Sequence, residues 1–234
     1  MTSNHELDDA AEALPPAVSE LFGTGASTAR GERTRQELIV AAKICFEEFG
    51  YTKTRISDIV QRAGVSHGNF YRHFTNKADV LTAAIHPCVC DLLQGTRRNG
   101  RSDSGDLSAL IASTTSYFTV YARHRQLMRV MHEAAAAQDG SGFIEKWLLI
   151  RREFTARTSG WLGHLQERGV IAYDCDVDTL TEALSAMTEQ LAHLEIGLPE
   201  KAPRAEQLIR MGRTAGEIWY RSIPWTPRAV PPAS

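Results

Sequence analysis

Eighteen consecutive residues, GVSHGNFYRHFTNKADVL (64–81), combine two amides, a guanidinium, two imidazoles and three aromatic rings, most of them directly behind a Gly-Val-Ser turn. An Asn side chain can form paired hydrogen bonds with adenine and an Arg side chain with guanine, and each pair contributes about 1–3 kcal/mol of discrimination. Tyr, His and Lys side chains can reach phosphate oxygens, which fixes a register without reading a sequence. The chemistry available to this stretch is therefore recognition of a nucleic acid.

Helical periodicity on either side places this stretch in a defined local structure. Ser57 precedes an apolar pattern of about two helical turns that ends at Gly64, and Ser66 is the expected N-cap of a second helix that runs to Phe74. Gly64 suits the turn because a left-handed backbone is costly for a residue with a Cβ. A helix, a tight turn and a second short helix form a helix-turn-helix, whose second helix enters the major groove of DNA.

The second helix divides its residues between an anchored face and a free face. Phe70 and Phe74 are four positions apart, so they share one face and are expected to enter the core. The predicted base-facing set consists of His67, Gly68, Asn69 and Arg72. The residues with the reach to bind phosphates are Tyr71, His73 and Lys77. The two histidines also fit an alternative in which they are only solvated surface groups.

An amphipathic helix precedes the helix-turn-helix and supports it. Apolar residues from Leu38 to Phe49 recur at the spacing of one helix face, and Gly50 supplies the C-terminal stop. Three short helices with short joints therefore form one compact unit. Its predicted core comprises Leu38, Phe46, Phe49, Ile56, Ile59, Val60, Val65, Phe70 and Phe74.

The net charge of −2 hides an asymmetry along the chain. Residues 1–29 contain five acidic residues and neither Lys nor Arg, whereas residues 30–81 contain nine basic and six acidic residues. A polyanion would therefore bind the block that contains the helix-turn-helix. This excess of positive charge is too small to establish nucleic-acid binding by itself.

The rest of the 234-residue chain also has helical periodicity. It predicts helices at 77–98, 106–123, 125–137, 142–168, 177–196 and 203–222, separated by segments rich in turn residues. No sustained apolar-polar alternation competes, so the chain is predicted to be all-α, with about nine helices in total. Residues 1–30 are expected to form a flexible acidic tail with at most a short helix, and residues 224–234 a loose C-terminal tail.

The segment RTRQELIVAAKICFEEFGYTKTRISDIVQRAGVSHGNFYRHFTNKADVL resembles the N-terminal domain of the TetR family of bacterial transcription regulators. The shared features include Phe49-Gly50-Tyr51, the turn at Ala63-Gly64-Val65-Ser66, and His73-Phe74 before Asn76-Lys77. The resemblance implies a DNA-binding domain over residues 31–80, with its helix-turn-helix at about 55–74, and a ligand-binding and dimerisation domain over residues 81–223. The phosphate contacts that it implies are Thr54, Arg55, Tyr71, His73 and Lys77.

The sequence HPCVC (86–90) offers a second chemistry, because imidazole and thiolate groups are zinc ligands. His86 and Cys90 would share a helix face, whereas Cys88 lies roughly opposite and Pro87 interrupts the helix. A DNA-bound metal or redox sensor acting through Cys88, Cys90 and His86 is therefore the alternative function. Cysteines that only pack in the core are the other interpretation.

Aromatic and Met side chains on the later helices suggest a ligand cavity. A stripe from Phe143 to Leu165 runs at helical spacing, and such a stripe usually belongs to the core. In the TetR architecture this helix also walls a cavity, so the resemblance implies a pocket for a small apolar or aromatic effector. The candidate pocket residues are Tyr117, Tyr121, Met128, Met131, Trp147, Phe154 and Trp161.

The last two helices carry a pattern typical of a dimer interface. Leucines and one Met recur at steps of four and three from Leu180 to Leu194, and Gly212 and Gly216 are about one turn apart. Small residues permit close helix approach, so two such helices from each chain could form a four-helix bundle, as they do in the family. The candidate interface residues are Leu184, Met187, Leu191, Leu208, Gly212, Gly216 and Trp219. A core within one chain is the alternative.

These observations predict a homodimeric DNA-binding regulator, a repressor that a small molecule releases from a palindromic operator. The sequence has no Gly-rich phosphate loop and no nucleophile elbow, so we expect no enzyme activity, no catalytic residues, no cofactor and no metal. The four cysteines show no disulfide framework, and no apolar run approaches the length of a membrane span. A cytoplasmic protein without a membrane partner is therefore expected.

Overall fold

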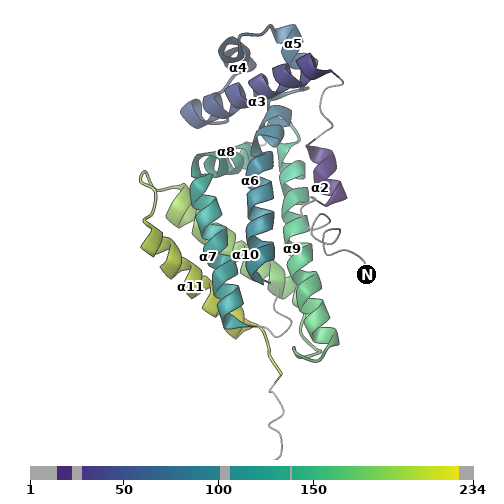
Figure 1. Cartoon of the computed structure of the whole chain (residues 1–234), viewed down its shortest axis with the longest axis vertical. Helices are drawn as coiled ribbons and strands as arrows, with labels where there is room; N and C mark the ends of the chain where they lie inside the picture. Colours follow the sequence, from purple (N-terminus) through teal and green to yellow (C-terminus); the bar gives the residue numbers. More distant parts are fainter. Residues whose placement is uncertain (1–14, 23–27, 101–105, 138, 227–234) are drawn as a thin grey trace, which may run out of the picture. The chain divides into compact units, whose positions relative to one another are not determined.

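A computed structural model describes residues 15–22, 28–100, 106–137 and 139–226 of the chain, and most of them are helical (Figure 1). The helices are α2 (Pro16–Leu21), α3 (Ala29–Phe49), α4 (Ile56–Ala63), α5 (His67–Tyr71), α6 (Lys77–Gly100), α7 (Leu107–Arg123), α8 (Arg125–Ala136), α9 (Phe143–Glu167), α10 (Val177–Ala192), the π-helical η1 (His193–Gly197) and α11 (Ala205–Ser222). In these ranges the only β-type pairing is an isolated bridge between Ile171 and Trp225. The all-α prediction is confirmed.

The α-helix that sequence reasoning did not place is α2, within the segment expected to be a flexible tail. Val18 on α2 and Phe22 just after it are buried. The ring of Phe22 packs on His86 of α6 with 4.4 Å between centroids, and its carbonyl accepts a hydrogen bond from Arg35 Nη2 at 3.0 Å. The part of the predicted N-terminal tail that the structure describes is thus docked, whereas residues 1–14, 23–27 and 227–234 of the two tails lie outside the described residues.

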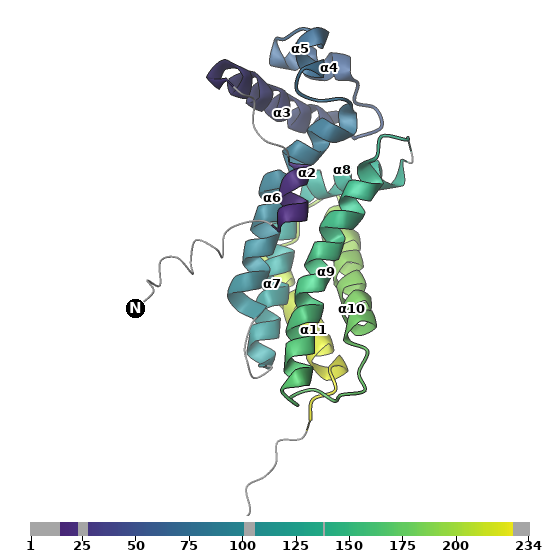
Figure 2. The same ribbon diagram turned by 90° about the vertical axis from the view of Figure 1, so that its right-hand side faces the viewer.

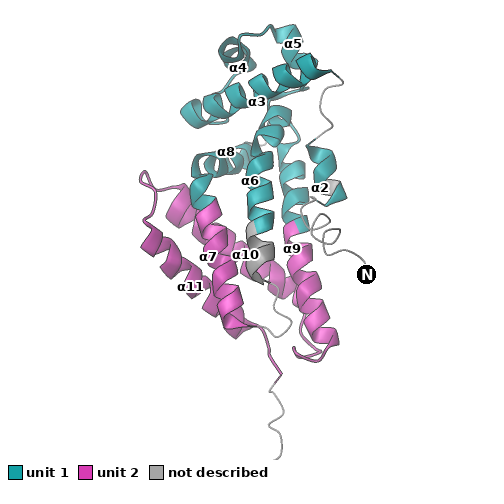
Figure 3. Cartoon of the chain, in the orientation of Figure 1, with its two compact units in different colours: residues 1–94, 121–153 teal, residues 95–120, 154–234 magenta. Residues whose placement is uncertain are grey.

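The chain packs as two units (Figure 3). Unit 1 comprises residues 1–94 and 121–153, and unit 2 comprises residues 95–120 and 154–234. The helices α6, α7 and α9 therefore contribute to both units. The expected boundary between a DNA-binding and an effector domain, at residue 81, falls inside α6, and that functional division stays a prediction.

In unit 1, α3 lies between the pair α4–α5 on one side and α8 on the other (Figures 1 and 2). The α4 helix is tied to α3 by two hydrogen bonds between the Arg62 guanidinium and the Glu48 carboxylate, at 2.9 and 2.5 Å. This bidentate pair adds geometric specificity to the apolar contact between the helices. The helix-turn-helix therefore rests on the remainder of unit 1 through α3.

The predicted core of the helix-turn-helix unit is largely correct. The buried members are Leu38, Phe46, Ile59, Val60, Phe70 and Phe74. The prediction that Phe49 is buried is wrong, because this last residue of α3 is 46% exposed. Tyr51 is fully buried instead. Gly50, with φ of 79°, redirects the chain at this point, and the Tyr51 ring stacks on Phe46 at 5.8 Å. Ile56 and Val65 are half-buried.

Unit 2 has a core formed by α7, α9, α10, α11 and the segments beside them. Its buried members are Leu110, Leu162, Leu165, Ile171, Leu184, Trp219 and Ile223. The indole N–H of Trp219 donates to Thr188 Oγ1 at 3.0 Å, which satisfies the polar end of a buried ring. No helix in the described parts of the chain combines the length and the apolar character needed to cross a bilayer.

Candidate nucleic-acid interface

A three-residue turn sets α5 against α4. Gly64 has φ of 67° and ψ of 28°, the left-handed region that favours glycine. The N–H of Val65 donates to Val60 O at 3.0 Å, which closes the end of α4. Ser66 Oγ then accepts the N–H of Asn69 at 3.2 Å, so that the expected N-cap of α5 is present.

The α4 helix begins at Ile56, so Ser57 lies inside its first turn. The carboxylate of Asp58 reaches back and accepts the N–H of Arg55 at 2.9 Å, so an acidic residue of the first turn caps the helix.

Two aromatic rings anchor α5 in unit 1. Phe70 is fully buried and Phe74 is 5% exposed, with 5.8 Å between their ring centroids. The Arg35 guanidinium of α3 lies over the Phe74 ring at 5.5 Å. Both interactions fix the depth and rotation of α5, so its opposite side is presented in a defined orientation.

The base-facing candidates lie on the free side of this anchored helix. His67, Gly68 and Arg72 are exposed, and Asn69 is half-buried. Arg72 is the C-cap residue of α5, since the helix ends one residue earlier than Arg72. The structure thus collects these four residues within one short helix and its cap, which is the geometry that direct readout requires. Their contacts with bases stay a prediction.

The phosphate candidates fall into three groups. Arg55 is exposed, and Tyr71 is 57% exposed, with its ring packed edge-on against Phe70 at 5.4 Å between centroids. His73 is half-buried beside Phe74. The expected phosphate contact of Thr54 is corrected, because this residue is 2% exposed. Its hydroxyl donates to Gly50 O at 2.6 Å and to Cys45 O at 3.1 Å. Its side chain closes the turn between α3 and α4 and has no surface to offer a phosphate.

Lys77 is engaged within the chain. Its Nζ donates to Tyr51 O at 2.8 Å and lies 4.1 Å from the centroid of the Tyr51 ring. Burial lowers the pKa of Lys77, and the nearby Asp139 and Glu133 carboxylates oppose that shift. An ammonium group has three N–H donors. A phosphate contact from Lys77 would therefore use the N–H donors that are not bonded to Tyr51 O.

A polar junction between the α3–α4 turn and α8 was missed by sequence reasoning. Glu133 of α8 accepts the main-chain N–H groups of Tyr51 and Thr52 at 2.9 and 2.8 Å. The Tyr51 hydroxyl lies 3.2 Å from Asp139 Oδ2 and 3.1 Å from Ser141 Oγ, and burial raises the pKa of Tyr51 to about 12. The partners are more than 80 positions apart in sequence, so no local pattern could have indicated the contact.

The cysteine cluster does not form the sensor site considered from the sequence. Pro87 lies inside α6 without interrupting it, and Cys90 Sγ lies 3.5 Å from His86 Nε2. Cys88 is fully buried with its Sγ 3.5 Å from Met128 Sδ, and burial raises its pKa to about 12. In the described ranges no three His, Cys, Asp or Glu side chains are placed to share a metal ion. A buried neutral thiol is unreactive, so Cys88 fits the packing interpretation.

The candidate effector-pocket residues divide between the units. Tyr121, Met128 and Met131 are buried in unit 1, where Trp147 is half-buried. Tyr117, Phe154 and Trp161 are half-buried in unit 2, and Trp161 packs against its core. A role for any of them in ligand binding stays a prediction.

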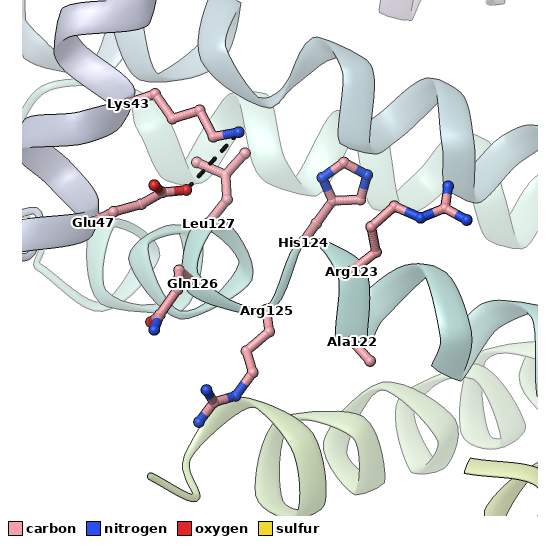
Figure 4. A pocket seen from close by; sticks show the side chains of 8 residues that line it. All are labelled: Lys43, Glu47, Ala122, Arg123, His124, Arg125, Gln126 and Leu127. Atoms are coloured by element: carbon pink, nitrogen blue, oxygen red, sulfur yellow. Dashed lines mark ion pairs between the residues drawn. The ribbon is translucent and has the colours of Figure 1, made fainter. Parts of the chain in front are cut away.

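A different pocket opens between α3 and the α7–α8 turn in unit 1 (Figure 4). Its volume is about 160 Å³, and its lining consists of Lys43, Glu47, Ala122, Arg123, His124, Arg125, Gln126 and Leu127. Two cations of this lining have acidic partners: Lys43 pairs with Glu47 at 3.9 Å, and Arg123 pairs with Asp91 at 3.1 Å. His124 Nε2 lies 2.8 Å from Asp91 Oδ2. None of the seven candidate residues lines this polar pocket, which does not resemble the apolar cavity that we expected.

The glycines proposed for a dimer interface instead face α7 of the same chain. A Cβ on Gly212 would lie 2.6 Å from Thr115 Cα, and one on Gly216 would lie 2.7 Å from Ile111 Cα. Leu184 and Trp219 belong to the core of unit 2, and Leu208 is 9% exposed. The assignment of these five residues to a dimer interface is therefore replaced by the alternative, a core within one chain, because they are already packed against residues of the same chain. Met187 and Leu191 remain partly exposed.

The comparisons with known proteins agree with this geometry. Residues 38–84, from α3 to α6, match the family described as "Bacterial regulatory proteins, tetR family". The transcriptional activator FasR of Mycolicibacterium smegmatis is 31% identical over 104 residues, which are 44% of this chain and 47% of FasR. The regulator TtgR of Pseudomonas putida is 28% identical over 112 residues, 46% of this chain and 53% of TtgR. The alignment thus spans about half the length of each relative.

Solved structures extend the likeness to most of the chain. GusR of Salmonella enterica superposes with a TM-score of 0.66 at 20% identity, over 84% of this chain and 98% of GusR. SmeT, the repressor of the Stenotrophomonas maltophilia multidrug efflux pump SmeDEF, superposes with a TM-score of 0.63 at 21% identity. This superposition covers 92% of this chain and 97% of SmeT. The fold and the turn geometry define a helix-turn-helix protein with an all-helical C-terminal part. Residues 38–84 are similar to the TetR family of bacterial transcription regulators, and the fold of most of the chain is similar to these solved structures.

Proposed function

We propose that the chain is a sequence-specific DNA-binding transcription regulator. The observation that carries this proposal is α5, a capped short helix anchored by Phe70 and Phe74 with Arg72 exposed beside it. Such a helix fits the major groove, where an exposed guanidinium can bind guanine O6 and N7. Relatives named as transcription regulators support it.

Selection from a pool of random duplexes tests this function. We expect the wild-type chain to enrich one palindromic sequence, with each half-site read by one α5. A parallel selection with Asn69 and Arg72 both changed to Ala should yield no enrichment or a relaxed sequence. A wild-type selection that returns random sequence at every salt concentration would contradict DNA recognition.

The second part of the proposal is that two copies associate through α10 and the region that follows it. One side of α10 and η1 exposes Ala183, Ala186, Gln190 and Leu194, and Leu194 is the large hydrophobic residue among them. Met187 and Leu191 flank this side, and Leu198 after η1 is 52% exposed. A helix face with small and apolar residues and few charges suits close packing against a second copy.

The third part is that a small apolar or aromatic molecule releases the protein from DNA. A solved SmeT–triclosan complex, with a TM-score of 0.65 to this chain, supports this part as an example of such a ligand bound to a protein of this fold. Binding to one of two conformations shifts their populations by the difference in affinity. We expect an effector to raise the thermal midpoint and change the emission of Trp147 or Trp161; ligands that release DNA without either effect would contradict the candidate pocket residues.

Repression is proposed as the direction of regulation. Relatives include the activator FasR and the repressor BepR of Brucella suis, so the family itself allows both. Transcription in vitro from a promoter that overlaps the selected operator should fall when the protein is added. An increase would reverse this part and leave DNA binding intact.

A further inference from the structure

A carboxylate from α8 holds the turn between α3 and α4. Glu133 Oε2 accepts the N–H of Tyr51 at 2.9 Å, and Oε1 accepts the N–H of Thr52 at 2.8 Å. One carboxylate that spans two successive main-chain donors fixes both the distance and the direction of approach. The position of this turn is therefore set by α8 as well as by α3.

A side chain at position 50 would crowd the Glu133 carboxylate in the position that it occupies here. A Cβ on Gly50 would lie 2.8 Å from Glu133 Oε2 and 3.3 Å from Oε1. The φ of 79° at Gly50 also belongs to the region that favours glycine. Two features of the sequence, 83 positions apart, thus fit one another at this contact.

Hydrogen bonds, with a smaller contribution from a nearby charge, favour the ionised form of Glu133. Burial acts to raise the pKa of Glu133, but the hydrogen bonds from Thr52 and Tyr51 and the nearby Lys77 together hold it below its usual value. Lys77 donates to Tyr51 O at 2.8 Å, so the same turn is held from α6 as well. At neutral pH the contact is a charge-assisted one, and each such bond is about twice as strong as a neutral one.

The turn leads directly into the helix-turn-helix. The Thr54 hydroxyl donates to Gly50 O at 2.6 Å, and α4 begins two residues after Thr54. We propose that Glu133 is a positioning residue for DNA recognition, which fixes the α3–α4 turn and with it α4 and α5 relative to α8. This inference rests on the proposed DNA-binding function. It also gives α8 a direct route by which a displacement would reach the reading helix.

The test uses Glu133→Gln in the full chain, with Glu145→Gln as the matched control. Gln keeps the size of the side chain but presents an NH2 group to one of the two N–H donors. Glu145 is an exposed acid at the start of α9, so its change removes the same charge. Each variant is measured for its affinity for the selected operator and for a random duplex of equal length.

We expect Glu133→Gln to lower the ratio of operator to random affinity about tenfold, because the reading helices lose their fixed orientation. Its affinity for random DNA should stay equal or rise slightly, since a negative charge is removed from a protein that binds a polyanion. Glu145→Gln should leave the ratio unchanged. A purely structural role would lower the thermal midpoint and the folded fraction without changing the ratio for the molecules that are folded.

A second variant keeps the test valid if Glu133→Gln folds poorly. Glu133→Asp retains the charge, but its side chain is one methylene shorter and reaches only one of the two N–H groups. We therefore expect a smaller reduction in the ratio of operator to random affinity. If wild type prefers its operator and both variants keep the full ratio, the positioning role is wrong and the proposed function stands. If wild type prefers no duplex, the proposed function fails and the positioning role fails with it.

Discussion

Arg72 and Asn69 differ in how freely their side chains can meet a base. Arg72 is exposed at the end of α5, whereas Asn69 is half-buried. A planar guanidinium can bind guanine O6 and N7 together from an exposed position. We therefore expect Arg72 to contribute the larger part of base discrimination.

Arg72→Ala should lower the preference for the operator over random DNA by about 1–3 kcal/mol, because the variant cannot form the bidentate pair with a base in each half-site. Competition binding with both duplexes measures this difference. Arg129→Ala, which removes an exposed Arg from α8, is the control that should change neither value. Equal reductions in affinity for both duplexes in the Arg72 variant would mean that Arg72 binds only the backbone.

Lys77 combines a structural contact with a predicted DNA contact. Lys77→Met should reduce the free energy of unfolding by about 1–2 kcal/mol, because Met replaces neither the hydrogen bond to Tyr51 O nor the cation–π interaction. It should also reduce the slope of log affinity against log salt by about one for each phosphate that Lys77 neutralises. Urea denaturation and a salt series separate the two effects. A lower stability with an unchanged slope would leave Lys77 with the structural role alone.

Residue types and spacing predicted which side of α5 is free, because one helical turn separates Phe70 from Phe74 and both must be covered. They could not predict Thr54, whose hydroxyl is used by Gly50 O and Cys45 O in a buried turn. They also could not indicate Glu133, since its partners come from a distant segment and an acidic residue on α8 has no local signature. Contacts that close between distant segments are decided by tertiary packing.

At the scale of elements, two glycines of α11 determine how closely it lies against α7. Gly216→Ala should destabilise unit 2 by about 1–3 kcal/mol, because the added methyl group meets Ile111 main-chain atoms at less than 3 Å. Gly163→Ala on α9 is the matched change, since a Cβ there meets no atom within 4 Å. It should leave stability unchanged or raise it by about 0.5–1 kcal/mol.

Urea denaturation of both glycine variants measures these effects. A Gly216→Ala protein as stable as the Gly163→Ala protein would contradict the close approach of α11 to α7. The small-residue pattern in the sequence correctly predicted a close helix contact, but it could not say whether the neighbour belongs to the same chain or to a second copy. The structure assigns that contact to the same chain for Gly212 and Gly216.

Helix positions were predicted more accurately than helix contacts. The later helices begin and end within a few residues of the expected ranges, because periodicity and turn residues are local signals. The docking of α2 was missed because Val18 and Phe22 are too few to give a periodic pattern. A short helix is stabilised by the surface on which it packs, and that surface is invisible in the local sequence.

At the scale of the whole molecule, the proposed dimer depends on the free side of α10 and η1. Leu194→Glu should produce monomers, because a charge would enter an apolar contact between two copies. Leu148→Glu is the matched control, since Leu148 is 47% exposed on α9 and Leu194 is 48% exposed. Sedimentation equilibrium should show dimers for wild type and Leu148→Glu. Monomers in the control alone, or dimers in both variants, would place the interface elsewhere.

The most direct measurement is methylation interference on the selected operator, because guanine N7 and adenine N3 lie in different grooves. The account predicts that methylation of guanine N7 blocks binding at two symmetric half-sites about 34–36 Å apart. With Arg72→Ala, interference should disappear at one guanine in each half-site. Interference confined to adenine N3 in the minor groove, or a pattern that Arg72→Ala leaves unchanged, would contradict recognition of the major groove by α5.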